Sequence, residues 1–429
     1  MNTFKTIRAA VMCSLILLLS QQILLAQTGN WTHFRGSSLN GISTDAQLPE
    51  SWNDSTNIIW KTDISDKGWS SPVVFNDQLW VTASTGDGKQ LKALCMDFIS
   101  GSKVFDLNIF QPDSVYPKHS INSYATPTPC IEEGFVYLHY GSYGTACVKT
   151  SDGTLVWKRN DLTCEHVQGP ASSPMIYKNL LILHYEGTDV QYLVALDKHT
   201  GQTVWKTERP AALYEPLLPI GKKAYTTPLV VNVKGQYLLI SNGAAVCIAY
   251  DPETGKEVWR VVQGEDSTIA MPIAENGIVY FYTSFVTPAQ GEKYAELLAV
   301  NPDGKGDITA TNILWRFKSP ILQLSTPIIT DGLIYTIDTH NTLYCLDAKS
   351  GKEMYSKRLK SKYNASPVSD ANNIYFTSVK GETLVLKKGS TLQIVGENKL
   401  PGEVYATPAI ARNSILIRTD NCLYRIGTK

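Results

Sequence analysis

Short segments in which apolar residues alternate with polar ones recur along the whole chain, and Gly, Asn or Asp bounds most of them. Residues 79–84 (LWVTAS), 135–140 (FVYLHY), 278–283 (IVYFYT) and 333–338 (LIYTID) are of this kind. Alternation over four to eight residues, rich in β-branched and aromatic types, indicates β-strands, and the bounding residues indicate tight turns. The pattern therefore predicts an all-β protein built from many short strands.

A second phrase shows that these strands belong to a repeat. A small residue, then Ser, Thr or Met, then Pro, leads into an apolar strand eight times, at intervals of 40 to 55 residues. These prolines are Pro72, Pro127, Pro174, Pro228, Pro272, Pro327, Pro367 and Pro408. Each proline is followed by patterns for four strands joined by turns, which is the signature of a propeller blade. The repeat predicts an eight-bladed β-propeller of four-stranded antiparallel blades.

The two ends of the repeat predict how the ring closes. The final unit, residues 406–429, has room for only three strands, whereas residues 57–64 (NIIWKTDI) have a strand pattern outside the first unit. Pairing this N-terminal strand with the final unit leaves no open sheet edge. We therefore expect residues 57–429 to form the propeller, with residues 57–64 completing the last blade, and residues 27–56 to form an N-terminal extension.

A turn motif recurs inside the units, as in residues 195–207 (ALDKHTGQTVWKT) and 249–261 (AYDPETGKEVWRV). An Asp side chain can bond the backbone two residues on, and Gly supplies a positive φ, so the motif predicts the hairpin between the third and fourth strands. A large aromatic residue four positions after the Gly can wedge between neighbouring blades, burying roughly 150–250 Å². This aromatic is Phe105, Trp157, Trp205, Trp259 or Tyr355 in its own unit, and Trp60 in the N-terminal strand. The motif is interpreted as structural.

The cysteines fit the same repeat. Cys95, Cys147 and Cys345 stand two residues before the Asp position, where other units have Ala, and this is typical of a small buried packing residue. Cys130 and Cys147, which we place in adjacent strands of one blade, are the pair for which a disulfide is considered. The sequence contains neither the Cys-x-x-Cys-His of covalent haem attachment nor a Cys/His cluster with zinc spacing.

The N-terminal residues predict export. Lys5 and Arg8 precede a short apolar run that ends near Ala26, so residues 1–26 are interpreted as a cleaved signal peptide of a periplasmic or secreted protein. Polar residues interrupt the run, which makes it a poor membrane anchor, and the mature chain is expected to have no transmembrane segment. Lys plus Arg and Asp plus Glu both number 39, so no overall field favours nucleic acid as a partner.

The repeats Ala-x-Asp-x-x-Thr-Gly-x-x-x-Trp, together with residues 31–43 (WTHFRGSSLNGIS) and 221–230 (GKKAYTTPLV), resemble those of the quinoprotein-like propellers. That group includes the pyrroloquinoline quinone (PQQ) dehydrogenases and the lipoprotein that assists outer-membrane barrel assembly. Over residues 30–427 the chain is most similar to exported bacterial PQQ-binding-like propeller repeat proteins. The resemblance implies the same fold, and we expect a monomer.

The resemblance also raises the question of a quinone cofactor. The dehydrogenases of the group have two adjacent cysteines over PQQ and a carboxylate and Asn set that holds Ca²⁺. This sequence has no Cys-Cys dipeptide. We therefore expect neither a cofactor nor a metal. PQQ with calcium remains the alternative, in which the protein is an oxidoreductase with a degenerate site.

The loops that enter the innermost strands are expected to open at one mouth of the central channel. Aromatic residues stand three positions before four of the prolines, and polar residues lie near them, which suits a site for a small molecule or a sugar. The candidate ligand-binding residues are Trp69, Tyr124, Tyr225, Tyr405, His119, His166, Gln168 and Lys222. The competing interpretation is that the aromatic residues only cap the ends of blades.

The sequence thus favours a binding or scaffold protein that engages a protein or a carbohydrate at the channel mouth. Two alternatives stay open. One is the PQQ-dependent oxidoreductase. The other is a lyase-like protein of a polysaccharide-degrading system, in which His119 or His166 acts as acid or base with a Tyr and a Lys of the channel.

Overall fold

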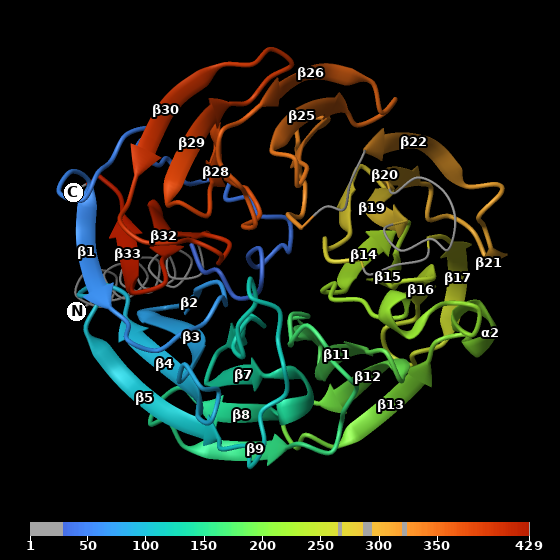
Figure 1. Ribbon diagram of the computed structural model, residues 1–429, viewed down its shortest axis with the longest axis horizontal. Helices are drawn as coiled ribbons and strands as arrows, with labels where there is room; N and C mark the ends of the chain where they lie inside the picture. The colour runs from blue at the N-terminus through green and yellow to red at the C-terminus, as the bar shows by residue number, and fades with distance from the viewer. Residues whose placement is uncertain (1–28, 265–267, 286–293, 320–323, 429) are drawn as a thin grey trace, which may run out of the picture.

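The computed structural model describes residues 29–264, 268–285, 294–319 and 324–428, and these residues form a ring of eight sheets (Figure 1). Each sheet is one blade with four antiparallel strands, which follow chain order in every blade except blade 8. The all-β, eight-bladed propeller expected from the repeat is confirmed.

The first four blades follow one another from the N-terminal half of the chain. Blade 1 contains β2 (Val73–Phe75), β3 (Gln78–Ser84), β4 (Leu91–Asp97) and β5 (Lys103–Phe110). Blade 2 contains β6 (Cys130–Glu132), β7 (Phe135–His139), the 3₁₀ turn η1 (Gly141–Tyr143), β8 (Thr145–Lys149) and β9 (Leu155–Arg159). Blade 3 contains β10 (Met175–Tyr177), β11 (Leu180–Glu186), β12 (Gln191–Asp197) and β13 (Thr203–Glu208). After α2 (Ala211–Tyr214) and η2 (Pro219–Gly221), blade 4 contains β14 (Leu229–Val233), β15 (Gln236–Asn242), β16 (Val246–Tyr250) and β17 (Glu257–Val262).

The other four blades complete the ring. Blade 5 contains β18 (Ile273–Glu275), β19 (Ile278–Phe285), β20 (Tyr294–Val300) and β22 (Ile313–Ser319). Between them β21 (Gly306–Asp307) pairs in parallel with β17 and adds a fifth strand to blade 4. Blade 6 contains β23 (Ile328–Thr330), β24 (Leu333–Ile337), β25 (Thr342–Asp347) and β26 (Glu353–Arg358). Blade 7 contains β27 (Val368–Ser369), β28 (Asn373–Thr377), β29 (Glu382–Lys387) and β30 (Ile394–Lys399). Blade 8 contains β31 (Ala409–Ala411), β32 (Ser414–Arg418), β33 (Cys422–Ile426) and, from the N-terminus, β1 (Ile58–Asp63).

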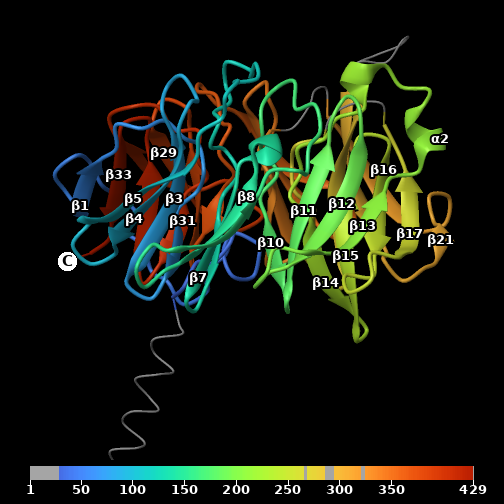
Figure 2. The ribbon, with the colours of Figure 1, turned by 90° about the horizontal axis from the view of Figure 1, so that it is seen from below.

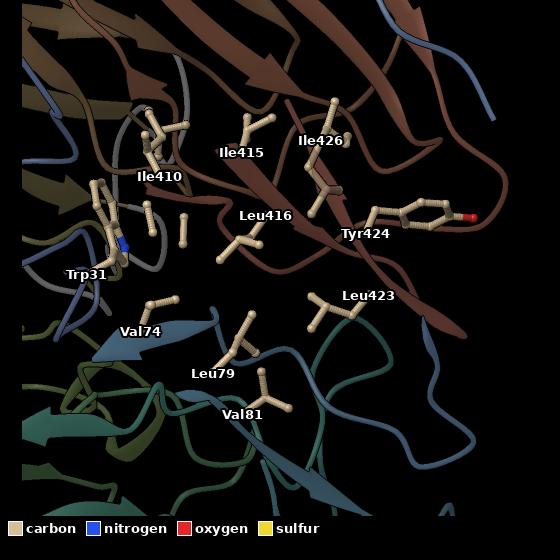
Figure 3. Packing of buried hydrophobic residues seen from close by; sticks show 14 of the residues in the cluster. Trp31, Val74, Leu79, Val81, Ile410, Ile415, Leu416, Leu423, Tyr424 and Ile426 are labelled. Carbon is tan, nitrogen blue, oxygen red and sulfur yellow. The ribbon is translucent and has the colours of Figure 1, made fainter. Parts of the chain in front are cut away.

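The ring closes as the sequence predicts, because β1 pairs antiparallel with β33 and supplies the outer strand of blade 8. Between blade 8 and blade 1 lies a continuous apolar core (Figure 3). Its central side chains come from both blades, with Leu416 and Ile410 on one side and Leu79 and Val81 on the other. Burial of these aliphatic side chains, each worth roughly 1.5–3 kcal/mol, joins the two ends of the chain.

The turn motif forms the expected hairpin and the expected wedge. In the hairpin after β12, the carboxylate of Asp197 accepts the backbone N–H of Thr200 at 2.8 Å. The indole N–H of Trp157 donates to the carbonyl oxygen of Lys198 at 2.9 Å, so the blade 2 indole is bonded to the blade 3 hairpin. The same bond joins Trp60 to Phe98, Trp205 to Pro252, and Trp315 to Ala348. The motif therefore fixes the contact between successive blades.

The wedge leads to a prediction for Gly255, which lies in the blade 4 hairpin at φ +68°. A Cβ added to Gly255 would lie 2.6 Å from the ring of Trp205, whereas one added to Gly277, at φ +77°, would meet nothing within 4 Å. Both Gly→Ala variants incur left-handed backbone strain of about 1–2 kcal/mol. Gly255→Ala adds a clash of about 1–3 kcal/mol. Urea denaturation should show the larger loss for Gly255→Ala, and equal losses would contradict the wedge.

Residues 29–48, here called the strap, run across the lower mouth of the channel. The strap begins beside blade 1, where Trp31 and Val74 exchange two backbone hydrogen bonds of 2.9 and 2.8 Å. It ends beside blade 7, where the N–H of Ser43 donates to the carbonyl oxygen of Ser369 at 2.9 Å. Figure 1 shows the blue N-terminal segment reaching the centre of the ring. The N-terminal extension is therefore an integral part of the fold.

Arg35 anchors the strap near the axis. Its side chain is fully buried, and its two terminal nitrogens donate to the carbonyl oxygens of Pro327 at 2.9 Å and Pro367 at 3.1 Å. These two prolines begin the inner strands of blades 6 and 7. Burial lowers the pKa of Arg35 to about 9, so the guanidinium still carries its charge at neutral pH.

Two further observations bear on the sequence interpretation. All seven cysteines of the described chain are buried and free. Cys130 and Cys147 do not lie in adjacent strands as expected, because both are paired with Tyr137 of the strand between them. Two strand spacings separate them by about 10 Å, which is beyond the Cα separation that a disulfide spans.

The part of the chain that is described contains no helix with the length and apolar character needed to cross a bilayer. The signal-peptide prediction for residues 1–26 lies outside the described residues.

Candidate functional site

A cavity of about 500 Å³ opens at the upper mouth of the channel, opposite the strap. In Figure 2 the upper side carries α2, and the hairpin between β14 and β15 extends from the lower side. The upper part of the cavity wall contains one residue from every blade, three positions before the proline that precedes the inner strand. These residues are Trp69, Thr126, Ala171, Tyr225, Ile269, Leu324, Asn364 and Tyr405. The rings of Trp69 and Tyr405 contact each other, with centroids 4.6 Å apart.

The prediction for Tyr124 is wrong in its position. Strand β6 begins at Cys130, so the proline that precedes the inner strand of blade 2 is Pro129, and Pro127 is not equivalent to Pro72. Thr126 therefore occupies the mouth position, and Tyr124 lies two residues earlier. The sequence itself distinguishes the two prolines. Pro129 is followed by a three-residue strand and then a turn, as Pro72 is in blade 1, whereas Pro127 is not.

The remaining predicted residues divide between two pockets. His119 and Gln168 line the channel cavity together with Trp69, Tyr225 and Tyr405. Tyr124 and His166 instead line a neighbouring pocket of about 530 Å³. Lys222 is not among the lining residues of either pocket, whereas Lys223 lines the channel cavity. The structure thus brings together five of the eight predicted residues.

The two histidines are consequently not part of one site. The ring of His166 stacks on Tyr185, with centroids 6.2 Å apart. Burial lowers the pKa of His166 to about 4, although the charge of Asp189 opposes the shift. The ring of His119 accepts the backbone N–H of Ile121 at 3.3 Å. Because the two rings line different pockets, only His119 shares the channel cavity with Tyr225, Tyr405 and Lys223.

A second ring of residues lies deeper in the cavity, one position before the same prolines. Seven of these residues carry hydroxyl groups and line the cavity: Ser71, Thr128, Ser173, Thr227, Thr326, Ser366 and Thr407. This position was identified from the sequence as Ser, Thr or Met, but no role was assigned to its hydroxyl group. Its recurrence as Ser or Thr in seven of eight blades is the signal that a hydroxyl is required.

The hydroxyl groups connect the blades around the axis. The backbone N–H of Ser71 donates to the Thr128 hydroxyl at 2.9 Å, and that of Thr128 donates to the Ser173 hydroxyl at 3.0 Å. The same bond, at 2.9 to 3.0 Å, joins Ser173 to Thr227, Met271 to Thr326, Thr326 to Ser366, and Ser366 to Thr407. Met271 interrupts the belt because its side chain has no hydroxyl. We call the seven residues the hydroxyl belt.

The strap closes the cavity from below, because Phe34 is one of the lining residues. The cavity is therefore a blind pocket that opens only upward among the described residues. Among the described residues, its lining contains one charged side chain, Lys223, and no Asp or Glu. Across the described part of the chain, no three His, Cys, Asp or Glu side chains gather where they could hold a metal ion.

A buried ionic network fixes the loop that forms one side of the rim. The Glu186 carboxylate, at the end of β11, accepts hydrogen bonds from Tyr214 of α2, from the backbone N–H of Ala244 at 2.9 Å, and from His184 at 2.7 Å. Arg209 approaches the same carboxylate at 3.3 Å. Burial alone would raise the pKa of Glu186, but the Arg209 charge and the hydrogen bonds outweigh it and hold the pKa below its ordinary value. The network ties blade 3 to blade 4 and to the rim loop.

Comparison with known proteins places the repeats in a known family. The family model described as outer membrane protein assembly factor BamB matches residues 53–212, 189–305 and 297–393. Quinohemoprotein alcohol dehydrogenase ADH-IIG of Pseudomonas putida is 30% identical over 145 residues, which cover 31% of this chain and 19% of that protein. Outer membrane protein assembly factor BamB of Moranella endobia is 23% identical over 257 residues, which cover 59% of this chain and 60% of that protein.

The match therefore spans less than two thirds of either relative. Among solved structures, the quinohemoprotein alcohol dehydrogenase of Comamonas testosteroni superposes with a TM-score of 0.68 at 12% identity, over 94% of this chain and 81% of that chain. At this level of identity the superposition shows a shared fold.

Proposed function

The chain belongs to the family of the outer membrane protein assembly factor BamB, and on that basis we propose that it is an exported, monomeric binding protein that engages its partner at the upper mouth of the propeller. The observation that carries the proposal is the blind pocket, whose wall receives a side chain from every blade. A concave, mostly apolar pocket with a few polar groups is the usual form of a binding site.

The rim of the pocket supports a protein as the partner. Leu218, Ile220 and Ile121 lie on the loops around the mouth, and between 41 and 60% of each side chain is exposed. Apolar side chains gathered at one opening are typical of interaction surfaces. The relatives named as assembly factors agree with this choice. A carbohydrate is the competing ligand, because Trp69 and Tyr405 present an aromatic surface beside the amide of Asn364.

The pocket does not fit PQQ held by calcium. Calcium takes six to eight oxygen ligands, among which carboxylates are usual. The described lining supplies no carboxylate, and six of the seven hydroxyl groups in its lower ring already accept backbone N–H bonds. The dehydrogenase relatives therefore support the fold of this chain without supplying its chemistry, and we assign no redox step to the site.

Site-specific photo-crosslinking tests the binding proposal. A photoreactive residue at Ile220 should give a discrete protein adduct in cells that produce and export the chain. The matched control places the same residue at Ile99, which is 56% exposed in the β4–β5 hairpin at the lower end of blade 1.

Trp69→Ala in the Ile220 crosslinking variant should reduce the adduct at least tenfold, because removal of a large aromatic anchor from a pocket typically costs binding 2 kcal/mol or more. Circular dichroism should show an unchanged fold. Equal adducts from Ile220 and Ile99, or an adduct insensitive to Trp69→Ala, would contradict the proposal. A saccharide that protects Ile220 from crosslinking would identify the carbohydrate alternative.

A further inference from the structure

The hydroxyl belt has hydrogen-bonding capacity that the fold does not use. Six of its hydroxyl oxygens accept a backbone N–H from the preceding blade. A hydroxyl has one proton to donate in addition to its acceptor sites. Among the described residues, these six protons have no acceptor within hydrogen-bonding distance, and the Ser71 hydroxyl has no partner of either kind.

The belt residues are all at least nine-tenths buried. Their exposure ranges from 1% for Ser71 to 6% for Thr407. A buried polar hydrogen without an acceptor costs free energy, commonly about 1–3 kcal/mol from protein data. Seven such hydroxyl groups around one axis would therefore stabilise a ligand group that only accepts hydrogen bonds.

Positive charge lies directly behind the belt. Arg35 donates to the carbonyl oxygens of Pro327 and Pro367, which follow the belt residues Thr326 and Ser366 in the chain. At the boundary between blades 8 and 1, next along the ring from blade 7, Arg418 is also fully buried and donates to the Ser70 hydroxyl at 2.9 Å, next to the belt residue Ser71.

No carboxylate in the described part of the chain forms a salt bridge with either guanidinium. The Nε of Arg35 and one terminal nitrogen of Arg418 have no hydrogen-bond acceptor there. The two buried cations form no salt bridge there, although the charge of Asp66 offsets part of that of Arg418. They raise the potential of the pocket floor, so an anion is favoured in the pocket and a cation is disfavoured.

The upper ring has the opposite character. Ile269, Leu324 and Ala171 are apolar, and Trp69 and Tyr405 add aromatic faces. From these two layers we infer that the pocket binds an organic oxyanion, with its acidic head among the hydroxyl belt and an apolar body against the upper ring. The inference rests on the proposed binding function of this pocket and adds the chemical class of the ligand. A carboxylate or sulfonate accepts hydrogen bonds without donating any, which matches the belt.

Such a head group has two sources, namely a small organic acid or the C-terminal carboxylate of a protein partner. Calorimetry on the intact protein with matched probes distinguishes them. Phenylacetate represents the free acid, and phenylacetamide is its neutral counterpart. The tripeptide Gly-Gly-Phe with a free carboxylate represents the protein terminus, and its C-terminal amide is the neutral counterpart.

In at least one pair, the acid should bind at least tenfold more tightly than its amide, since hydrogen bonds to a charged group are worth about 1.5–3 kcal/mol each. Thr407→Val removes one belt hydroxyl and should reduce the acid-to-amide ratio severalfold, whereas Thr407→Ser should restore it. Ser390→Ala, at an exposed serine outside the pocket, should leave the ratio unchanged. The ratio is measured on folded protein, so a loss of stability in Thr407→Val does not affect it.

Two results would overturn the inference. One is equal affinity of acid and amide in both pairs, and the other is a ratio that does not change in Thr407→Val. Neither result affects the crosslink from Ile220, so the inference can fail while the binding function stands. Loss of the Trp69-dependent crosslink would instead remove the binding function itself.

Discussion

Replacing Glu186 by Gln is expected to lower the free energy of unfolding by about 3–5 kcal/mol, because the change leaves the Arg209 guanidinium buried without its counter-charge. The side chains of Glu186, Arg209 and His184 are all completely buried. Gln keeps the size of Glu, but its amide NH2 must face donors at one of the two oxygen positions, so the loss combines broken hydrogen bonds with the missing charge. No other group in the network replaces it, because Tyr214 and the Ala244 N–H are hydrogen-bond donors.

Urea denaturation at pH 7 measures this change, and Glu253→Gln is the matched control. Glu253 pairs with Lys178 on the surface, where more than half of each side chain is exposed. Solvent screens such pairs, so the control should change stability little. The pH dependence follows from the lowered pKa of Glu186. The stabilisation is present above the unfolded pKa and is lost as pH falls through the folded pKa, so the difference between wild type and Glu186→Gln should begin to shrink as pH falls below the unfolded value of about 4.3. Similar losses for Glu186→Gln and Glu253→Gln would contradict a network that depends on charge.

The architecture could be predicted because the same turn and packing residues recur in successive blades of the propeller. The Asp and Gly of residues 195–207 identify a hairpin wherever they recur, and the aromatic residue after them identifies the contact with the next blade. Ring closure followed from the surplus strand at residues 57–64. The strap could not be predicted, because residues 29–48 have no repeat and contact the lower mouth through irregular backbone and the Arg35 side chain.

The candidate site could be predicted only in part. Counting back from the prolines located Trp69, Tyr225 and Tyr405 at one opening, but a second proline two residues away displaced the assignment from Thr126 to Tyr124. The hydroxyl belt was missed for a different reason. Ser and Thr are also small, and only the bonds between blades show that the oxygen of this residue, as well as its size, is used. Contacts between blades depend on how the ring folds, and the residue spacing within one repeat does not predict them.

Mild acid is expected to destabilise the protein steeply, at about 4 kcal/mol per pH unit between about pH 6 and pH 4.5, because the folded chain holds three histidines in their neutral form. Burial lowers the pKa of His139 to about 3, and the charge of nearby His166 adds to the shift. Burial also lowers the pKa of His166 and His33 to about 4 each. Between these values and the ordinary 6.5, the unfolded chain binds a proton that the folded chain excludes. Unfolding is therefore favoured as pH falls, by about 1.4 kcal/mol per unit and histidine.

Each histidine has a structural reason to remain neutral. The ring of His33 accepts the backbone N–H of Ile176 at 3.3 Å and links the strap to blade 3, so protonation would remove that acceptor. His139 shares a hydrogen bond of 2.9 Å with Thr145 inside blade 2. Acid should therefore weaken the attachment of the strap and the wall between the two pockets.

Guanidinium denaturation at pH 7.5, 6 and 5 measures the slope. The histidines should account for a loss of about 5 kcal/mol between pH 6.5 and 5, a large part of the 5–15 kcal/mol typical of folded domains. His139→Gln should reduce the slope by about one third, whereas His199→Gln, at an exposed position in the blade 3 hairpin, should leave it unchanged. Because the carboxylates titrate mainly below this range, a slope that survives replacement of His33, His139 and His166 would show that other groups bind the protons.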